Sequence, residues 1–216
     1  MPDELPPDAT PFEPEIRAFE AEDRRRPPPR DAVLFVGSSS IRLWTTLADD
    51  FPAVPVINRG FGGSELADSV RYAHRIVTPY APPQIVLYAG DNDLAAGKTP
   101  AQVSTDLVAF VRTVRAALPR VPVAFISIKP SPSRLLLMKR IRKANELIRE
   151  FARDDPCLAF IDVFTPMLDA AGRPRAELFI EDALHLNRTG YELWAAVIRP
   201  YVIEQRGLPC ERRRRQ

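Results

Sequence analysis

Ser38, Ser39 and Ser40 follow the apolar run VLFVG near the beginning of the chain. A serine hydroxyl is a poor nucleophile by itself and needs a neighbouring base before it can attack a carbonyl carbon. A serine at this place can also cap a helix, because its oxygen accepts a hydrogen bond from an N–H group of the first turn. The cluster therefore indicates a helix cap, a nucleophile, or both functions carried by different serines.

The chain has two histidines, His74 and His185, and only one of them is a candidate base. His74 lies beside Val70 and Val77 in a helical pattern, so we expect it to be partly buried and structural. His185 follows Asp182 by three residues, and positions i and i+3 of a helical turn face one another. The carboxylate could then hold one imidazole nitrogen and leave the other as a base for a serine.

Two further loops contain groups that could stabilise a negatively charged oxygen. The loop NRGFGGS at residues 58–64 has three glycines, so its backbone N–H groups can come close to a substrate. Asn92, in YAGDNDLAAG at residues 88–97, has a side-chain amide that can donate to the same oxygen. Glycine, asparagine and aspartate are also ordinary loop-forming residues. Each loop taken alone therefore has a structural explanation as well as a chemical one.

The elements that must position these residues alternate regularly after residue 31. Five short runs rich in β-branched and aromatic residues predict buried strands, at residues 32–37, 54–58, 84–90, 121–128 and 158–163. Four stretches predict the helices, at residues 64–77, 99–118, 134–152 and 187–202. This alternation predicts a three-layer α/β/α fold with a flavodoxin-like five-stranded parallel sheet of order 2-1-3-4-5. In such a sheet the functional loops follow the carboxyl ends of the strands, which is where the serines, the glycines and Asn92 lie.

These blocks, in this order, resemble those of the SGNH (GDSL-like) hydrolase superfamily. The shared pattern is a serine after the first strand, a glycine after the second, an asparagine after the third, and D-x-x-H before the last helix; it covers roughly residues 32–203. The resemblance implies a serine hydrolase with a catalytic triad and an oxyanion hole. The residues to which it assigns a role are the nucleophile Ser39, the oxyanion donors Ser39 (through its N–H), Gly63 and Asn92, and the pair Asp182 and His185.

One residue departs from the family pattern, and two are candidates for substrate binding. Ser38 stands where the family usually has an aspartate, which affects the support of the nucleophile turn but leaves the nucleophile in place. We take Ser38 and Arg134 as the substrate-binding candidates. Arg134 follows the fourth predicted strand and could contact an anionic or hydroxylated substrate. The alternative for Arg134 is a surface residue at the start of a helix.

The loops between the predicted elements are short and leave little material for a lid over a long acyl chain. We therefore expect a serine esterase of the acetylesterase type, which hydrolyses carboxylic esters with short acyl groups through a covalent acyl-enzyme. Lysophospholipids and thioesters are substrates seen in the family and stay open as alternatives. The alternatives outside catalysis are a flavodoxin-like module that binds a flavin or phosphate at a helix N-terminus, and a catalytically inactive relative.

Charge and hydropathy restrict the partners. The 30 basic and 28 acidic residues give a formal net charge of +2. Basic residues gather in DRRRPPPR (23–30) and ERRRR (211–215) without interleaved aromatic residues, so we expect solvated segments and no nucleic-acid partner. No run approaches the length of a membrane span, and the N-terminus lacks the features of a secretory signal. We expect a cytoplasmic protein that binds a small-molecule ester and no membrane, and a homodimer is compatible with the sequence.

The composition also suggests the domain organisation. Residues 1–30 contain eight prolines and are expected to form an irregular N-terminal arm. Residues 31–205 are expected to form one hydrolase-like domain, and residues 206–216 a basic C-terminal tail. Cys157 and Cys210 show no metal-ligand spacing, and no cofactor motif occurs, so we expect neither a metal nor a cofactor.

Overall fold

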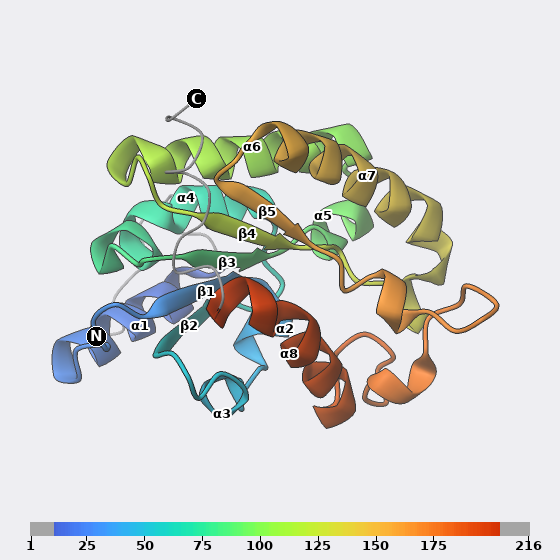
Figure 1. Ribbon diagram of the computed structural model, residues 1–216, viewed down its shortest axis with the longest axis horizontal. Coiled ribbons are helices and arrows are strands. Elements are labelled where there is room, and N and C mark those ends of the chain that lie inside the picture. Colours follow the sequence, from blue (N-terminus) through green and yellow to red (C-terminus); the bar gives the residue numbers. More distant parts are fainter. Residues whose placement is uncertain (1–10, 204–216) are drawn as a thin grey trace.

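The computed structural model describes residues 11–203, which form a five-stranded parallel sheet of order β2-β1-β3-β4-β5 (Figure 1). The strands are β1 (Val33–Gly37), β2 (Val56–Gly60), β3 (Ile85–Tyr88), β4 (Val123–Ile126) and β5 (Leu158–Ile161). The predicted fold class and strand order are confirmed. Each predicted apolar run contains or overlaps its strand, with ends displaced by a few residues.

Helices cover both faces of the sheet (Figure 1). One face packs against α1 (Glu13–Arg25), α4 (Leu66–Ile76), α6 (Pro100–Ala117) and α7 (Met138–Asp154). The other face packs against α2 (Ser39–Arg42), α3 (Leu47–Asp50) and α8 (Arg188–Ile203). The short α5 (Asp91–Ala95) follows β3, and the 3-10 helices are η1 (Thr78–Tyr80), η2 (Pro132–Leu137), η3 (Thr165–Met167) and η4 (Ala176–Leu178).

Burial on both faces explains why the strands read as continuous apolar runs. In β1 the side chains of Leu34 and Val36 belong to one hydrophobic cluster, and those of Val33 and Phe35 belong to the other. Successive side chains of a strand point to opposite faces, so a strand covered on both sides needs apolar residues at every position. The sheet thereby separates two cores and holds its strand ends in a fixed arrangement.

The helix α1 corrects the expectation of an irregular arm over residues 1–30. Its Ile16 is fully buried and packs in the same core as α4 and α6. Two of its carboxylates, Glu13 and Glu20, form ion pairs with Arg75 of α4 at 2.8 and 2.6 Å. Proline was a misleading signal because Pro14 occupies the first turn, where no N–H is needed, and the next prolines follow the helix.

Two smaller sequence expectations have opposite outcomes. The helix predicted at residues 99–118 is confirmed as α6, which Thr99 caps: its hydroxyl accepts from the Gln102 N–H at 3.2 Å, and Pro100 opens the helix. His74 is exposed on α4, whereas the pattern predicted partial burial. The basic tail at residues 206–216 lies outside the described residues. No helix among residues 11–203 is long and apolar enough to cross a membrane.

Candidate active site

The strand order brings three chemically important loops together at one edge of the sheet. Gly37 at the end of β1 is in register with Gly60 of β2 on one side and with Tyr88 of β3 on the other. Gly37 has φ +136°, and a Cβ added there would lie 1.8 Å from the Tyr88 carbonyl oxygen. Only glycine allows this close approach of β1 to β3. The loops after β1, β2 and β3 therefore begin side by side.

The nucleophile candidate lies at the first position of α2. Ser38 precedes it as the N-cap residue, and its carbonyl accepts from Ile41 and Arg42 at 2.9 and 3.1 Å. Ser39 is partly exposed, while Ser40 is buried. N–H groups of the first helical turn have no partner within the helix. The turn thus presents both the hydroxyl and the N–H of Ser39 at the strand ends.

His185 connects this serine to an aspartate. Its Nε2 lies 2.9 Å from Ser39 Oγ, across 146 residues of sequence, and its Nδ1 lies 2.5 Å from Asp182 Oδ2. The other oxygen of Asp182 accepts from the N–H groups of Leu184 and His185, both at 2.9 Å. Burial opposes the negative charge, but the hydrogen bonds from His185 and Leu184 outweigh it and lower the pKa of Asp182 to about 2. A carboxylate can only accept, so Nδ1 carries the hydrogen and Nε2 is left to accept from Ser39.

The loop that carries His185 is held by its own backbone and by a neighbouring segment. Phe179 and Leu186 form an antiparallel bridge, and the Ile180 N–H donates to the His185 carbonyl at 2.9 Å. The carbonyl of Ala183 accepts from the N–H of Ser133 in η2 at 3.0 Å. In Figure 1 this loop is part of the orange connection that leads into α8. Backbone hydrogen bonds within residues 179–186 and to η2 therefore hold the imidazole in position.

Gly63 and Asn92, the two other sites assigned from the sequence, are linked through one residue. The Asn92 side-chain N–H donates to the carbonyl of Ser64 at 3.1 Å. Gly63 is exposed, has φ +78°, and would place no added Cβ within 4 Å of another atom. The space in front of Gly63 is therefore open to a ligand.

Asp93 fixes the neighbouring backbone. Its carboxylate accepts from the Leu66 N–H at 3.1 and 3.2 Å and pairs with Lys98 at 3.0 Å. Burial raises the pKa of Asp93 to about 6, against the opposing effect of Lys98. This aspartate joins the start of α4 to α5. It therefore fixes the glycine loop, which precedes α4, relative to Asn92, which lies in α5.

Sequence reasoning missed a buried ion pair next to Asn92. Lys129, which follows β4, is 1% exposed and donates to Asp91 Oδ2 at 2.8 Å and to the Tyr88 hydroxyl at 3.1 Å. Burial opposes the charge on Asp91, but the attraction of Lys129 lowers its pKa. The sequence signal was a lysine directly after the apolar run VPVAFISI, where a buried charge requires a partner.

The two substrate-binding candidates lie in different environments. Ser38 is 1% exposed, and its hydroxyl is buried without a hydrogen-bond partner, so it lies behind the nucleophile turn. Arg134, in η2, is partly buried; its Nε has no hydrogen-bond partner, and its charge contributes to lowering the pKa of Asp91. Arg134 is therefore near the ends of β3 and β4, as its place after the fourth strand indicated.

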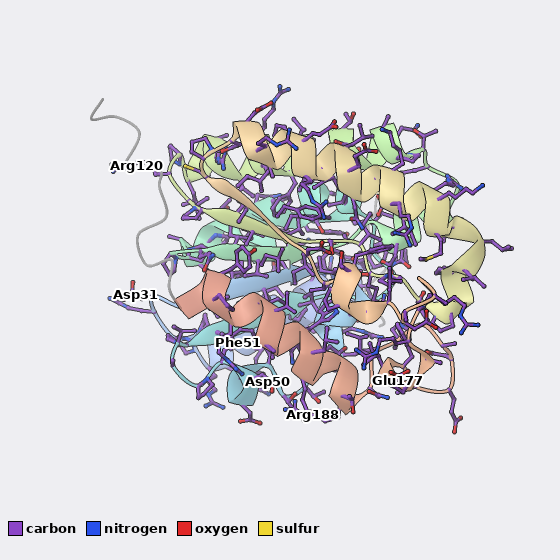
Figure 2. All side chains as sticks on the ribbon, turned by 45° about the vertical axis from the view of Figure 1, so that its right-hand side comes forward. Asp31, Asp50, Phe51, Arg120, Glu177 and Arg188 are labelled. Atoms are coloured by element: carbon purple, nitrogen blue, oxygen red, sulfur yellow. The ribbon has the colours of Figure 1, made fainter. Side chains whose placement is uncertain are left out.

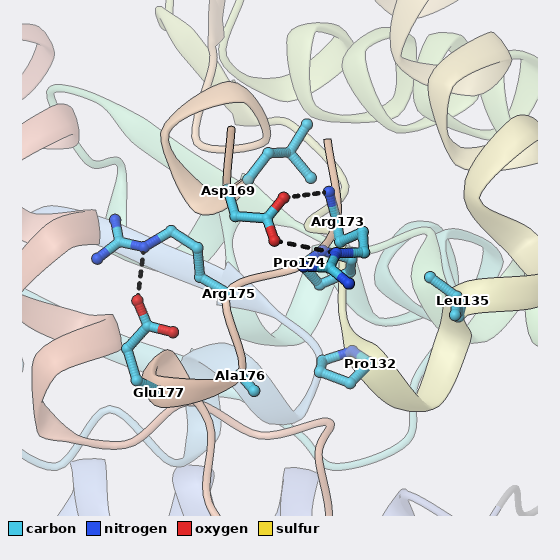
Figure 3. Close-up of a pocket in the computed structure, with 9 residues that line it drawn as sticks. Pro132, Leu135, Asp169, Arg173, Pro174, Arg175, Ala176 and Glu177 are labelled. Carbon is cyan, nitrogen blue, oxygen red and sulfur yellow. Dashed lines mark hydrogen bonds and ion pairs between the residues drawn. The ribbon is translucent and has the colours of Figure 1, made fainter. Parts of the chain in front are cut away.

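A cavity of about 630 Å³ is lined in part by η2 (Figure 3), the segment that binds the loop of His185 through the Ser133–Ala183 hydrogen bond. It is bounded by η2 and by residues 168–177, which run into η4, with apolar walls and two ion pairs, Arg173–Asp169 and Arg175–Glu177. Its lining residues are Pro132, Leu135, Leu168, Asp169, Arg173, Pro174, Arg175, Ala176 and Glu177. Within the described part of the chain, no group of three or more His, Cys, Asp or Glu side chains could hold a metal ion.

Comparison with known families yields one match over most of the chain. The model of the GDSL-like Lipase/Acylhydrolase family matches residues 35–193, which include every residue of the site described above. A search of the curated proteins finds no match.

Solved structures with the same fold are numerous but distant in sequence. A GDSL-like lipase from Bacteroides thetaiotaomicron superposes with a TM-score of 0.74 at 19% identity, covering 88% of this chain and 97% of that one. A lipase/acylhydrolase from Enterococcus faecalis gives 0.66 at 23%, covering 82% and 96%. A family 3 carbohydrate esterase from Clostridium thermocellum gives 0.68 at 15%, covering 82% and 98%. At these identities the likeness establishes the three-layer fold.

Proposed function

The chain belongs to the GDSL-like lipase/acylhydrolase family, and from this membership we propose that it is a serine esterase acting through a covalent acyl-enzyme. The observation that carries the proposal is the continuous chain of contacts from Ser39 Oγ to His185 Nε2 and from His185 Nδ1 to Asp182. This is the arrangement that a serine needs to become a nucleophile.

The proposed reaction has two steps. His185 takes the proton of Ser39 through Nε2 while Ser39 Oγ attacks the ester carbonyl, and Asp182 stabilises the imidazolium that forms. The N–H groups of Ser39 and Gly63 and the amide of Asn92 donate to the tetrahedral oxyanion. The imidazolium then protonates the leaving alcohol. Water, activated by His185, attacks the acyl-enzyme and releases the acid.

A fluorophosphonate probe followed by peptide mass spectrometry tests this function directly. Wild-type protein should be modified at Ser39 and should hydrolyse p-nitrophenyl acetate. Ser39→Ala should lose the label and nearly all turnover. Ser104→Ala, which removes a serine of α6 that belongs to none of the family motifs, is the matched control and should keep both the label and the turnover. A Ser39→Ala variant with wild-type turnover would refute the assignment.

For the substrate we propose esters with short acyl groups, acetyl above all, on an alcohol of moderate size. Two observations support this: the loops around Ser39 and Gly63 are short, and the cavity lined in part by η2 could receive the alcohol. One of the structures with the same fold is a carbohydrate esterase, which makes a sugar a candidate for the alcohol part of the substrate. A series of p-nitrophenyl esters from C2 to C8 is the test, and equal kcat/KM along the series would contradict a short-acyl preference.

Larger apolar substrates form the second candidate class. Leu135, which lines the cavity, is 54% exposed. Ile180, whose N–H binds the His185 carbonyl, is 48% exposed. Lysophospholipids or acyl thioesters would use such a surface. Binding of a flavin, by contrast, does not need the hydrogen bond between Ser39 and His185. A colourless preparation that takes up the fluorophosphonate label would exclude a flavin-binding module.

A further inference from the structure

The N-terminal helix α1 lies outside residues 35–193, which the family model matches, yet it reaches the candidate oxyanion loop. The ring of Phe12, just before α1, packs edge-on against Phe61 with centroids 5.4 Å apart. One turn further, the Glu15 carboxylate accepts from the N–H of Gly62 through Oε2 at 3.0 Å. The helix therefore contacts the loop at the two residues that precede Gly63.

The second oxygen of the same carboxylate contacts the nucleophile turn. Glu15 Oε1 accepts from Arg42 Nη1 at 2.9 Å, and Arg42 is the last residue of α2, the helix that begins at Ser39. The Arg42 guanidinium also lies against Gly62, because a Cβ added at Gly62 would be 2.7 Å from its Cζ. One carboxylate thus joins the segment that carries the nucleophile to the segment that carries the oxyanion glycine.

The backbone N–H of Gly62 is bound by Glu15, whereas the residues on either side of the two glycines are held by the loop and by β1. Phe61 is held by its N–H bond to the Gly37 carbonyl at 2.9 Å, and its own carbonyl accepts from the Ser64 hydroxyl at 2.9 Å. For the Gly62 N–H the acceptor is Glu15. Two consecutive glycines have more accessible backbone conformations than any other pair of residues, so an external contact has a large effect on their geometry.

We propose that Glu15 is a positioning residue for the oxyanion hole, an inference that rests on the esterase function proposed above. Its carboxylate fixes the Gly62–Gly63 backbone relative to Ser39, so that the Gly63 N–H points to the place where the carbonyl oxygen becomes negative. An oxyanion donor contributes only when it is aimed at that oxygen in the transition state. Loss of the carboxylate should therefore lower kcat and leave KM nearly unchanged.

The structure supplies a matched control on the same helix. Both carboxylate oxygens of Glu20 accept from Arg75 of α4, so this side chain anchors α1 to α4 and not to residues 58–64. Glu20→Ala weakens the attachment of α1, as Glu15→Ala does, but leaves the Gly62 hydrogen bond intact. Glu15→Gln keeps an oxygen that can accept from Gly62 while removing the charge that binds Arg42. These variants separate a role in docking α1 from a role in shaping the loop.

The experiment compares kcat, KM and inhibition by phenylboronic acid, whose tetrahedral serine adduct places an oxygen in the oxyanion hole. Glu15→Ala should lower kcat by roughly 10- to 100-fold, the effect of a displacement of about 1 Å in a catalytic group, and weaken the boronate by a similar factor. Glu15→Gln should fall between wild type and Glu15→Ala. Glu20→Ala should lower the melting temperature and leave kcat and the boronate constant unchanged.

Three results would overturn the inference: a Glu15→Ala variant with wild-type kcat, an equal loss in Glu20→Ala, or, where Glu15→Ala does not fold, a Glu15→Gln variant indistinguishable from wild type in kcat and boronate affinity. These results differ from failure of the proposed function. In that case wild-type protein itself hydrolyses no ester and takes up no fluorophosphonate.

Discussion

At the scale of single residues, the proposed oxyanion donor Asn92 has two side-chain N–H groups. One of them binds the Ser64 carbonyl, and the remaining N–H is available to a substrate oxygen. We expect Asn92→Ala to lower kcat by about 100- to 1,000-fold with a much smaller change in KM, because an oxyanion donor acts in the transition state. Steady-state kinetics on p-nitrophenyl acetate measure this. A rise in KM alone would mean that Asn92 binds the ground state.

Asp182 determines which nitrogen of His185 carries the hydrogen. In Asp182→Asn the amide can donate to Nδ1, so that Nε2 carries the hydrogen and can no longer accept from Ser39. We expect kcat to fall by about 10⁴-fold while the fold is retained. The rate of fluorophosphonate labelling at Ser39 should fall with kcat, and an unchanged labelling rate would show that the aspartate does not orient the base.

The sequence indicated some functional residues and not others for a physical reason. Ser39 and His185 stand out because each belongs to a recognisable local pattern. In the structure their side chains are 2.9 Å apart. Lys129 and Glu15 belong to no motif that names their partners, Asp91 and Gly62, although the position of Lys129 after an apolar run indicated a buried charge. Contacts of this kind depend on side-chain packing, which periodicity does not encode.

At the scale of elements, Asp50 joins α3 to α8 through a buried carboxylate (Figure 2). It accepts from Trp44 and Thr46, each at 2.8 Å, and from both terminal nitrogens of Arg188 at 2.7 Å. Burial opposes the charge, but the hydrogen bonds from Arg188, Trp44 and Thr46 outweigh it and lower the pKa of Asp50 to about 2. The carboxylate therefore favours the folded state whenever it is ionised.

The depressed pKa predicts a defined pH dependence. Stabilisation by Asp50 is complete above the pKa of an unfolded aspartate, near 3.8, and is lost as the pH falls towards 2. We expect Asp50→Asn to lower the free energy of unfolding by about 2 kcal/mol at pH 6, and the difference from wild type to shrink below pH 4. Urea denaturation between pH 6 and pH 3 measures it. Asp49→Asn, an exposed neighbour, is the control, and a difference independent of pH would contradict the prediction.

The strands could be predicted from the sequence more fully than the N-terminal helix α1, whereas the last helix, α8, was predicted at residues 187–202. Burial on both faces makes each strand an unbroken apolar run, a signal that needs no knowledge of its neighbours. Helix α1 is different, because its single fully buried residue, Ile16, and its ion pairs with Arg75 have meaning only once α4 is in place. The prolines on either side of α1 led to the prediction of an irregular segment in its place.

At the scale of the whole molecule, one sheet serves two cores. Both tryptophans, Trp44 and Trp194, are buried in the core between the sheet and α8. The core under α4, α6 and α7 contains none. We propose that the described chain, α1 included, is one cooperative unit, because every strand contributes side chains to both cores. Urea unfolding followed by tryptophan fluorescence and by far-ultraviolet circular dichroism should give one midpoint. Two midpoints would mean that the faces unfold independently.

The distance along the chain between Ser39 and His185 has a consequence for biosynthesis. When translation has reached Asn92, the proposed nucleophile Ser39 and the proposed oxyanion donors have been synthesised. The proposed base, His185, is still 93 codons away. Under the proposed mechanism, a product that stops before Asp182 lacks the base that activates Ser39. Ser39 becomes reactive only after residues 182–185 have been synthesised and have folded against it.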